Sequence, residues 1–320
     1  MDLQELEKIR IEYNAKKHEI SKKFWIVAGI IFAACFVLSL IPTSQYGFKG
    51  LAMQFLLSFI NPIFIIMAII AYFVIVSIST REMRANYRKL YKAYFIEKTL
   101  KSVFTDIRYD HGYGIDRNVL AETGMVNTGN LYSSNDFTIG KYKDVAFEQA
   151  DVKIQEEHTD SDGDTYYVTT FCGRFMMFEF PKKFNFRLEL IGKKFGASAT
   201  RINRSDKTKL KTQEIKTESV EFNKLFKIIA EDGFEAYYIL DPAFMEKIQS
   251  IAELYNHKVL FGFFDNKLLV GLNDGNDSFE PPKNLSKPIN EQEELAKVKG
   301  EIKVITDFVD VLKLDNKLFK

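Results

Sequence analysis

Two long apolar stretches near the N-terminus dominate the pattern of hydrophobic and polar positions. Phe24–Ile41 and Leu51–Ile78 contain no charged side chain. Six Lys or Arg residues precede the first stretch and six follow the second within residues 79–98, whereas Pro42–Gly50 holds only Lys49. Because the cytoplasmic flanks of membrane helices are enriched in Lys and Arg, the pattern predicts a transmembrane hairpin over 24–78. Its spans are 24–41 and 51–78, and both termini lie in the cytoplasm.

The first predicted span is short for a membrane helix. Its 18 residues would rise about 27 Å, close to the roughly 30 Å of a hydrocarbon core. A buried helix of a soluble domain and a cleaved signal peptide are the alternatives. A second apolar stretch directly after the first and a charged prefix of 23 residues favour a membrane hairpin over both.

Small and polar residues mark one face of each predicted span. Gly29 and Ala33 form a small-xxx-small pair in the first, and the second carries a stripe spaced at i, i+4, i+8 and i+11: Gly50, Gln54, Ser58 and Asn61. Such faces predict packing of the two helices against each other. A permeation path is the alternative, but neither span contains Asp, Glu, Lys, Arg or His, so an anchor is favoured.

Apolar positions recur every 3.6 residues on both sides of the hairpin. Residues 1–23 are predicted to form a cytosolic juxtamembrane helix, and residues 79–107 a cytosolic helical extension. After residue 107 the sequence contains runs typical of β-strands. Residues 108–274 are predicted to form a soluble α+β domain with antiparallel β-hairpins and packed helices. Residues 275–288 read as a turn-rich linker.

Alternating and aromatic-rich runs give the elements of this domain. Val145–Glu157 and Thr165–Phe180 flank an acidic turn at Asp160–Asp164 and predict a hairpin. Asp241 as N-cap and Pro242 in the first turn predict a helix through Leu254. Further expected elements are a strand at 187–191, a helix at 222–229, a strand at 237–240 and a second hairpin with arms 259–264 and 267–272.

The last segment, residues 289–315, is the clearest amphipathic helix. Its apolar residues follow a/d spacing over about three heptads, and the set is Leu295, Val298, Ile302, Ile305, Val309 and Leu312. Val304 and Phe308 widen the stripe, which favours packing on the protein's own domain over a two-stranded coiled coil.

Composition narrows the class of protein. A net charge of +1 gives no reason to expect nucleic-acid binding. The two cysteines, Cys35 and Cys172, cannot form a disulfide framework or a metal cluster, which fits a reducing cytosol.

Candidate chemical groups do not form a pattern that indicates a reaction. The acidic turn resembles the start of a calcium-binding loop, but Thr165 and Phe171 stand where an EF-hand needs Gly and Glu. His111 has no paired nucleophile, and Cys172 reads as a small core residue. We therefore predict no catalytic residue, cofactor or metal ligand.

One surface supports a binding hypothesis. A polar stretch after the strand at 187–191 is rich in Lys and Arg: Lys193, Lys194, Arg201, Arg204, Lys207, Lys209 and Lys211. Next to an inner membrane leaflet it could contact anionic lipid or an acidic partner. An ordinary solvated loop is the alternative.

Three segments resemble a bacterial family catalogued as a domain of unknown function. They are Phe171–Phe175 (FCGRF), Glu218–Phe226 (ESVEFNKLF) and Tyr238–Met245 (YILDPAFM). The resemblance implies two N-terminal transmembrane helices, a cytosolic domain and a bacterial inner (cytoplasmic) membrane location. Family genes sometimes neighbour those of LemA-type membrane proteins, so it also implies a LemA-type partner. It supplies no catalytic residues.

These observations predict a membrane-anchored cytosolic binding, scaffold or regulatory module. It would contact the lipid bilayer and an unknown protein partner, and a homo-oligomer is an open possibility. A membrane-tethered enzyme acting on a lipid or phosphate ester is the main alternative. A small-solute channel is the second, and it would need several copies because one hairpin cannot enclose a pore.

Overall fold

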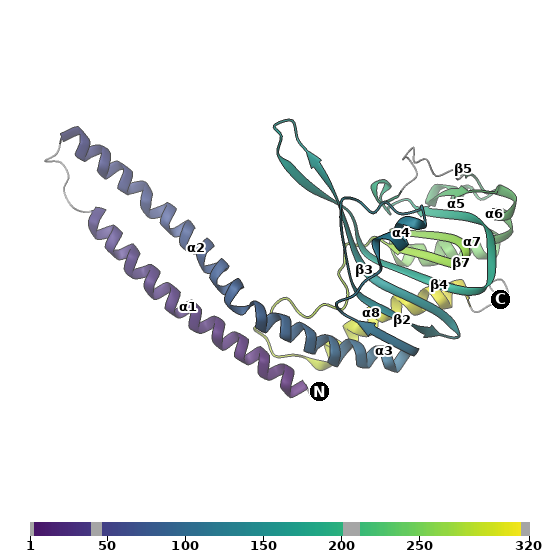
Figure 1. Cartoon of the computed structure of the whole chain (residues 1–320), viewed down its shortest axis with the longest axis horizontal. Coiled ribbons are helices and arrows are strands. Elements are labelled where there is room, and N and C mark those ends of the chain that lie inside the picture. The colour runs from purple at the N-terminus through teal and green to yellow at the C-terminus, as the bar shows by residue number, and fades with distance from the viewer. Residues whose placement is uncertain (1–2, 40–46, 201–211, 315–320) are drawn as a thin grey trace. The chain divides into compact units, whose positions relative to one another are not determined.

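The computed structural model describes residues 3–39, 47–200 and 212–314 of the 320 (Figure 1). They form two compact units. The first comprises Met1–Tyr94 and Pro281–Asn290, and the second comprises Phe95–Glu280 and Glu291–Lys320. The chain therefore contributes to the first unit twice, at its start and again late in the sequence.

Two long antiparallel helices make up most of the first unit. Helix α1 spans Leu3–Ser39 and α2 spans Gly47–Tyr91. Arg84 Nη2 donates a hydrogen bond to the Tyr13 hydroxyl at 2.6 Å, and the Trp25 and Tyr72 rings lie 5.5 Å apart. These contacts are separated by twelve residues on each helix, so α1 and α2 keep one antiparallel register between them.

The segment Pro281–Asn290 is fixed to the beginning of α1. Arg10 Nη1 donates to the Leu285 carbonyl at 3.0 Å, and Asn14 Nδ2 donates to the same oxygen at 2.6 Å. Arg10 is itself held by Glu7, with 2.6 Å between Nη2 and Oε1. The part of the predicted linker that lies in this segment is therefore ordered and bound to α1.

Among the residues described, one helical stretch is long and apolar enough to cross a membrane. It is Ile65–Val103, with a mean hydropathy of 1.8 over its most apolar window. It overlaps the second predicted span. The first predicted span does not meet the same criterion in the described part, so the two-span hairpin stays a prediction.

Short helices lead into the sheet of the second unit. A π-helical turn, η2 (Lys92–Glu97), and α3 (Lys98–Val103) precede β1 (Thr105–Asp110). The short helix α4 (Arg117–Glu122) and the strand β2 (Leu131–Tyr142) follow. Helix α4 was not among the predicted elements.

All strand pairs of the seven-stranded sheet are antiparallel, which confirms the predicted α+β class. The order is β1-β2-β3-β4-β6-β5, and β7 also pairs with β4. The remaining strands are β3 (Val145–Thr159), β4 (Thr165–Gly192), β5 (Gln213–Ile215), β6 (Phe226–Ala230) and β7 (Val259–Leu272).

Two predicted boundaries within the sheet are wrong. The expected strands Thr165–Phe180 and Arg187–Ile191 are one strand, β4. The expected hairpin over 259–272 is also one strand, β7, whose ends pair with opposite ends of β4. Asp265, in the left-handed region at φ 48°, marks a bend rather than a chain reversal. Pairing with β4 on both sides of this bend keeps the strand continuous.

The region after residue 211 also differs from prediction. The expected helix at 222–229 is split into α5 (Val220–Leu225) and β6. The expected strand at 237–240 is instead α6 (Gly233–Ile239), because the Asp232 side chain accepts hydrogen bonds from the amides of Phe234 and Glu235 and caps a helix. The predicted helix after Asp241 is confirmed as α7 (Pro242–Leu254), and Asp241 Oδ1 accepts from Phe244 N at 2.8 Å.

The C-terminal helix α8 (Glu291–Leu312) packs on its own domain, as favoured by its wide apolar stripe. Phe308 is fully buried, its ring stacks on Tyr255 at 5.4 Å, and it meets Phe261 of β7 at 6.0 Å. A separate core cluster includes Phe171 and Phe175, whose rings stack at 4.3 Å. This core holds the central strands of the sheet in place.

Candidate functional site

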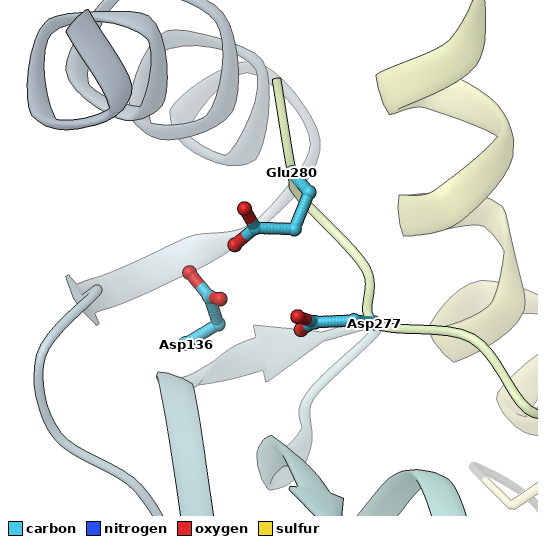
Figure 2. A group of neighbouring side chains, drawn as sticks. All are labelled: Asp136, Asp277 and Glu280. Carbon is cyan, nitrogen blue, oxygen red and sulfur yellow. The ribbon is translucent and has the colours of Figure 1, made fainter. Parts of the chain in front are cut away.

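Three carboxylates converge where the chain leaves β7 and crosses the sheet. One oxygen each of Asp136, Asp277 and Glu280 lies within 4.8 Å of the others. Figure 2 shows Asp277 and Glu280, from the segment after β7, pointing toward Asp136 on β2. We call these three residues the carboxylate cluster.

A bulge in β2 places the first member. The pairing of β2 with β3 shifts register between Asn135 and Thr138, and Asp136 adopts the left-handed region at φ 58°. This conformation is uncommon outside glycine, although Asp and Asn tolerate it best. The bulge buries the Asp136 side chain completely.

Neutral donors hold the Asp136 carboxylate. The Tyr109 hydroxyl donates to Oδ1, and Asn135 Nδ2 donates to Oδ2 at 2.5 Å. The same Asn135 nitrogen lies 3.5 Å from Asp277 Oδ1. Burial raises the pKa of Tyr109, and the negative charge of Asp136 raises it further. Tyr109 therefore stays protonated and remains a donor.

A buried ion pair lies under the same segment. Asp151 of β3 is 3% exposed, its Oδ1 is 3.5 Å from Arg174 Nε, and its Oδ2 accepts from Ser278 N at 2.5 Å. Burial raises the pKa of the Asp151 carboxyl to about 7. Arg174 opposes this rise, whereas the charges of Asp136 and Asp277 add to it.

Contacts from α8 hold the segment on its other side. Glu301 Oε2 accepts from Phe279 N at 3.0 Å, and Arg174 Nη1 donates to the Glu301 carbonyl at 2.7 Å. The Arg174 guanidinium lies 5.3 Å from the Phe279 ring centre, within the range of a cation–π contact. Lys297 Nζ donates to the Glu280 carbonyl. Residues 277–280 are thus fixed between the sheet and α8.

Carboxylate oxygens at this spacing are ligands of the kind that Ca²⁺ and Mg²⁺ prefer. Hydrogen bonds, an ion pair and a cation–π contact also account for the order of the segment without any ligand. The cluster by itself therefore does not specify a ligand, and no nucleophile paired with a base joins it in the part of the chain that the structure describes.

The cluster was missed by sequence reasoning. Asp136 and Asp277 are 141 positions apart, and no local pattern links them. Asp151, which lies under the same segment, gave no clear signal either, because Glu148, Gln149 and Lys153 are also polar positions of its strand.

The predicted basic surface is placed only in part. Lys193 and Lys194 are exposed after β4, and Lys194 Nζ donates to Asn256 Oδ1 at 2.6 Å. The other members, Arg201, Arg204, Lys207, Lys209 and Lys211, lie outside the described residues. Binding of lipid or an acidic partner by this loop stays a prediction.

The predicted hairpin-packing residues are likewise placed only in part. A Cβ added to Gly29 would meet no atom within 4 Å, and Ala33 is exposed, whereas Ala28 and Ala68 are buried. The surroundings of Gly50 and the side chains of Gln54, Ser58 and Asn61 lie outside the described part.

The surroundings of the remaining candidates, His111, Cys172 and the acidic turn, indicate structural roles. His111 lies on an exposed turn between β1 and α4. Cys172 is half-buried in β4, and burial raises the pKa of its thiol. The predicted acidic turn is confirmed as the tip of the hairpin between β3 and β4.

Residues 169–314 match the family described as "Protein of unknown function (DUF3137)". The expected resemblance to a catalogued domain of unknown function is confirmed for this region, which contains all three quoted segments. No curated protein matches the chain significantly.

One solved structure is distantly similar. It is the crystal structure of the mycobacterial trehalose monomycolate transport factor A, TtfA, with 9% sequence identity and a TM-score of 0.36. The match covers 71% of this chain and 94% of that one. A TM-score of this size does not establish a shared fold.

Proposed function

We propose that the protein is a multi-pass protein of the bacterial inner membrane whose α+β domain lies in the cytoplasm and binds a protein partner as a scaffold or regulator. The DUF3137 match supplies no activity. The proposal therefore depends on the exposed apolar surface of α1 and α2 and on the charges at their ends.

The observation that supports the membrane anchor is an apolar surface on helices α1 and α2. No other described residue covers this surface. Ile78 is 71% exposed, Phe73 65% and Ile30 65%. A large apolar side chain left half exposed in water costs about 1 kcal/mol, and soluble proteins rarely keep extended patches of this kind. The exposed set is Trp25, Ile26, Val27, Ile30, Ile31, Ile63, Ile65, Ile66, Met67, Ile69, Ile70, Phe73, Val74, Ile75 and Ile78. Surrounding lipid would remove this cost.

Aromatic and basic residues fit a membrane boundary at one end of this surface. The rings of Phe24 and Trp25 each lie 5.5 Å from that of Tyr72. Trp and Tyr favour the membrane interface. Lys22 and Lys23 precede these rings, and their long side chains can reach the headgroups. The second span and its basic flank then return the chain to the cytoplasm.

Alkaline carbonate extraction of membranes tests the anchor. The full-length chain should stay in the pellet, whereas a variant lacking residues 24–78 should be extracted. Extraction of the full-length chain would contradict the proposal.

Affinity capture in mild detergent tests the binding role. The full-length protein should retain a partner that a version lacking residues 95–320 does not. Equal recovery with both versions would place the binding activity outside the α+β domain.

A further inference from the structure

The hairpin between β3 and β4 extends past the sheet as an arm, residues 157–169. All of these residues are exposed. Among the described strands, β2 pairs with β3 only as far as Gln155, and β7 pairs with β4 only from Arg174 onward. The arm therefore has no neighbouring strand on either side. Figure 1 shows it projecting from the sheet.

Local contacts give the arm a defined shape. The register of β3 and β4 shifts between Ile154 and Gln155, where the strands leave the core, and such bulges bend a strand pair. At the tip, Asp160 Oδ1 accepts from Asp162 N at 3.0 Å and from Asp164 N at 2.9 Å. The arm is thus preformed, which lowers the entropy lost on binding.

The arm exposes apolar and aromatic surface that the domain does not cover. Tyr166 is 50% exposed, Tyr167 48% and Val168 42%. The His158 ring stacks on Tyr166 at 5.5 Å. A hydrogen bond to Glu157 raises the pKa of the Tyr167 hydroxyl. Exposed apolar and aromatic side chains gathered on one projecting hairpin suit a surface that a partner covers.

The charge of the arm identifies the chemistry of that partner. It carries four carboxylates, from Glu157, Asp160, Asp162 and Asp164, and no Lys or Arg. Charged residues on open strand edges also prevent aggregation, but that role does not explain the exposed tyrosines. An anionic membrane surface would be repelled. Lys and Arg side chains would pair with the carboxylates, and Arg favours tyrosine faces.

We propose that the arm is a docking element for a Lys- and Arg-rich segment of a partner protein. The cationic side chains pair with the arm's carboxylates and stack on Tyr166 and Tyr167. This inference rests on the binding role proposed above and adds the chemistry of the partner.

Site-specific photo-crosslinking tests the proposal in the full-length protein within its own membrane. A photoreactive amino acid replaces Val168, and the crosslinked peptide is identified by mass spectrometry. The proposal expects a protein segment of net positive charge. A lipid product, a neutral or acidic segment, or no product would overturn it.

Variants test whether the contact with the partner depends on the charge and the aromatic surface of the arm. Neutralising Glu157→Gln, Asp162→Asn and Asp164→Asn together should lower the crosslink yield about tenfold, as expected for three exposed ion pairs. Asp160 is kept because it holds the turn. The double variant Tyr166→Ser, Tyr167→Ser should also lower the yield. An unchanged yield in the charge-neutral variant would overturn the proposal.

A matched control removes the same charge elsewhere, with Glu291→Gln, Glu293→Gln and Glu294→Gln in the first turn of α8. Its yield should equal that of the parent, and an equal loss in this control would overturn a specific role for the arm. Membrane pelleting of the same cells separates the two proposals. Retention in the membrane without a basic crosslink refutes the arm alone, whereas a soluble protein refutes the membrane anchor.

Discussion

Replacing Glu189 with glutamine should make the α+β domain more stable at high pH. Glu189 lies on β4, opposite Ile229 of β6 and Gly262 of β7, and is 7% exposed. Burial raises the pKa of its carboxyl to about 7, although Arg187 opposes the rise. The carboxyl therefore ionises near neutral pH inside the fold and at lower pH in the unfolded chain.

The direction of the pH effect follows from proton counting. Between the unfolded and folded pKa values of Glu189, the folded protein holds a proton that the unfolded chain has released. The free energy of unfolding therefore falls as pH rises through this window and levels off above the folded value. From pH 5 to pH 8 the loss from this residue is about 2.5 kcal/mol. Glu189→Gln removes the loss and leaves stability nearly unchanged at pH 5.

Urea unfolding of the full chain in detergent, followed by circular dichroism, measures this effect. Glu179→Gln is the matched control, because Glu179 is exposed on the same strand and pairs with Lys267 at 3.1 Å. Its effect should stay below about 1 kcal/mol at both pH values. A parallel loss of stability in Glu189→Gln and the parent from pH 5 to pH 8 would contradict a raised pKa of the buried Glu189 carboxyl.

Two further substitutions test the packing of the domain. Phe308→Ala removes a buried ring that stacks on Tyr255 and should cost about 3–5 kcal/mol of unfolding free energy; a loss below about 1 kcal/mol would show that α8 does not depend on this contact. Gly173→Ala places a Cβ 2.0 Å from the Leu272 carbonyl at a φ of 152° and should cost at least about 2 kcal/mol. Its control, Gly300→Ala, meets no atom within 4 Å and should stabilise α8 by about 0.5–1 kcal/mol. Destabilisation by Gly300→Ala equal to that by Gly173→Ala would refute the steric argument.

Elements set by local chemistry were predictable from the sequence. The Asp241 cap with Pro242 in the first turn fixed the start of α7, and apolar spacing located α8. The acidic turn at Asp160–Asp164 located the tip of the arm. In each case the residues that determine the structure are neighbours in the chain.

Elements set by distant partners were not predictable. One local signal was also missed, because Tyr237 and Tyr238 favour strands by propensity whereas the Asp232 cap starts a helix. The segment 259–272 reads as a hairpin until its pairing along Arg174–Ile191 of β4 is known. The carboxylate cluster forms because a bulge in β2 lies next to the segment that follows β7. The periodicity of either segment alone does not predict that contact.

Cysteine labelling in intact spheroplasts tests the double crossing of the membrane most directly. In a background of Cys35→Ala and Cys172→Ser, single variants Ser44→Cys, between the predicted spans, and Ser161→Cys, in the arm, are treated with a membrane-impermeant maleimide. We expect labelling of Ser44→Cys in intact spheroplasts and labelling of Ser161→Cys only after permeabilisation. Labelling of Ser161→Cys in intact spheroplasts would place the α+β domain outside the cytoplasm and contradict the proposed function.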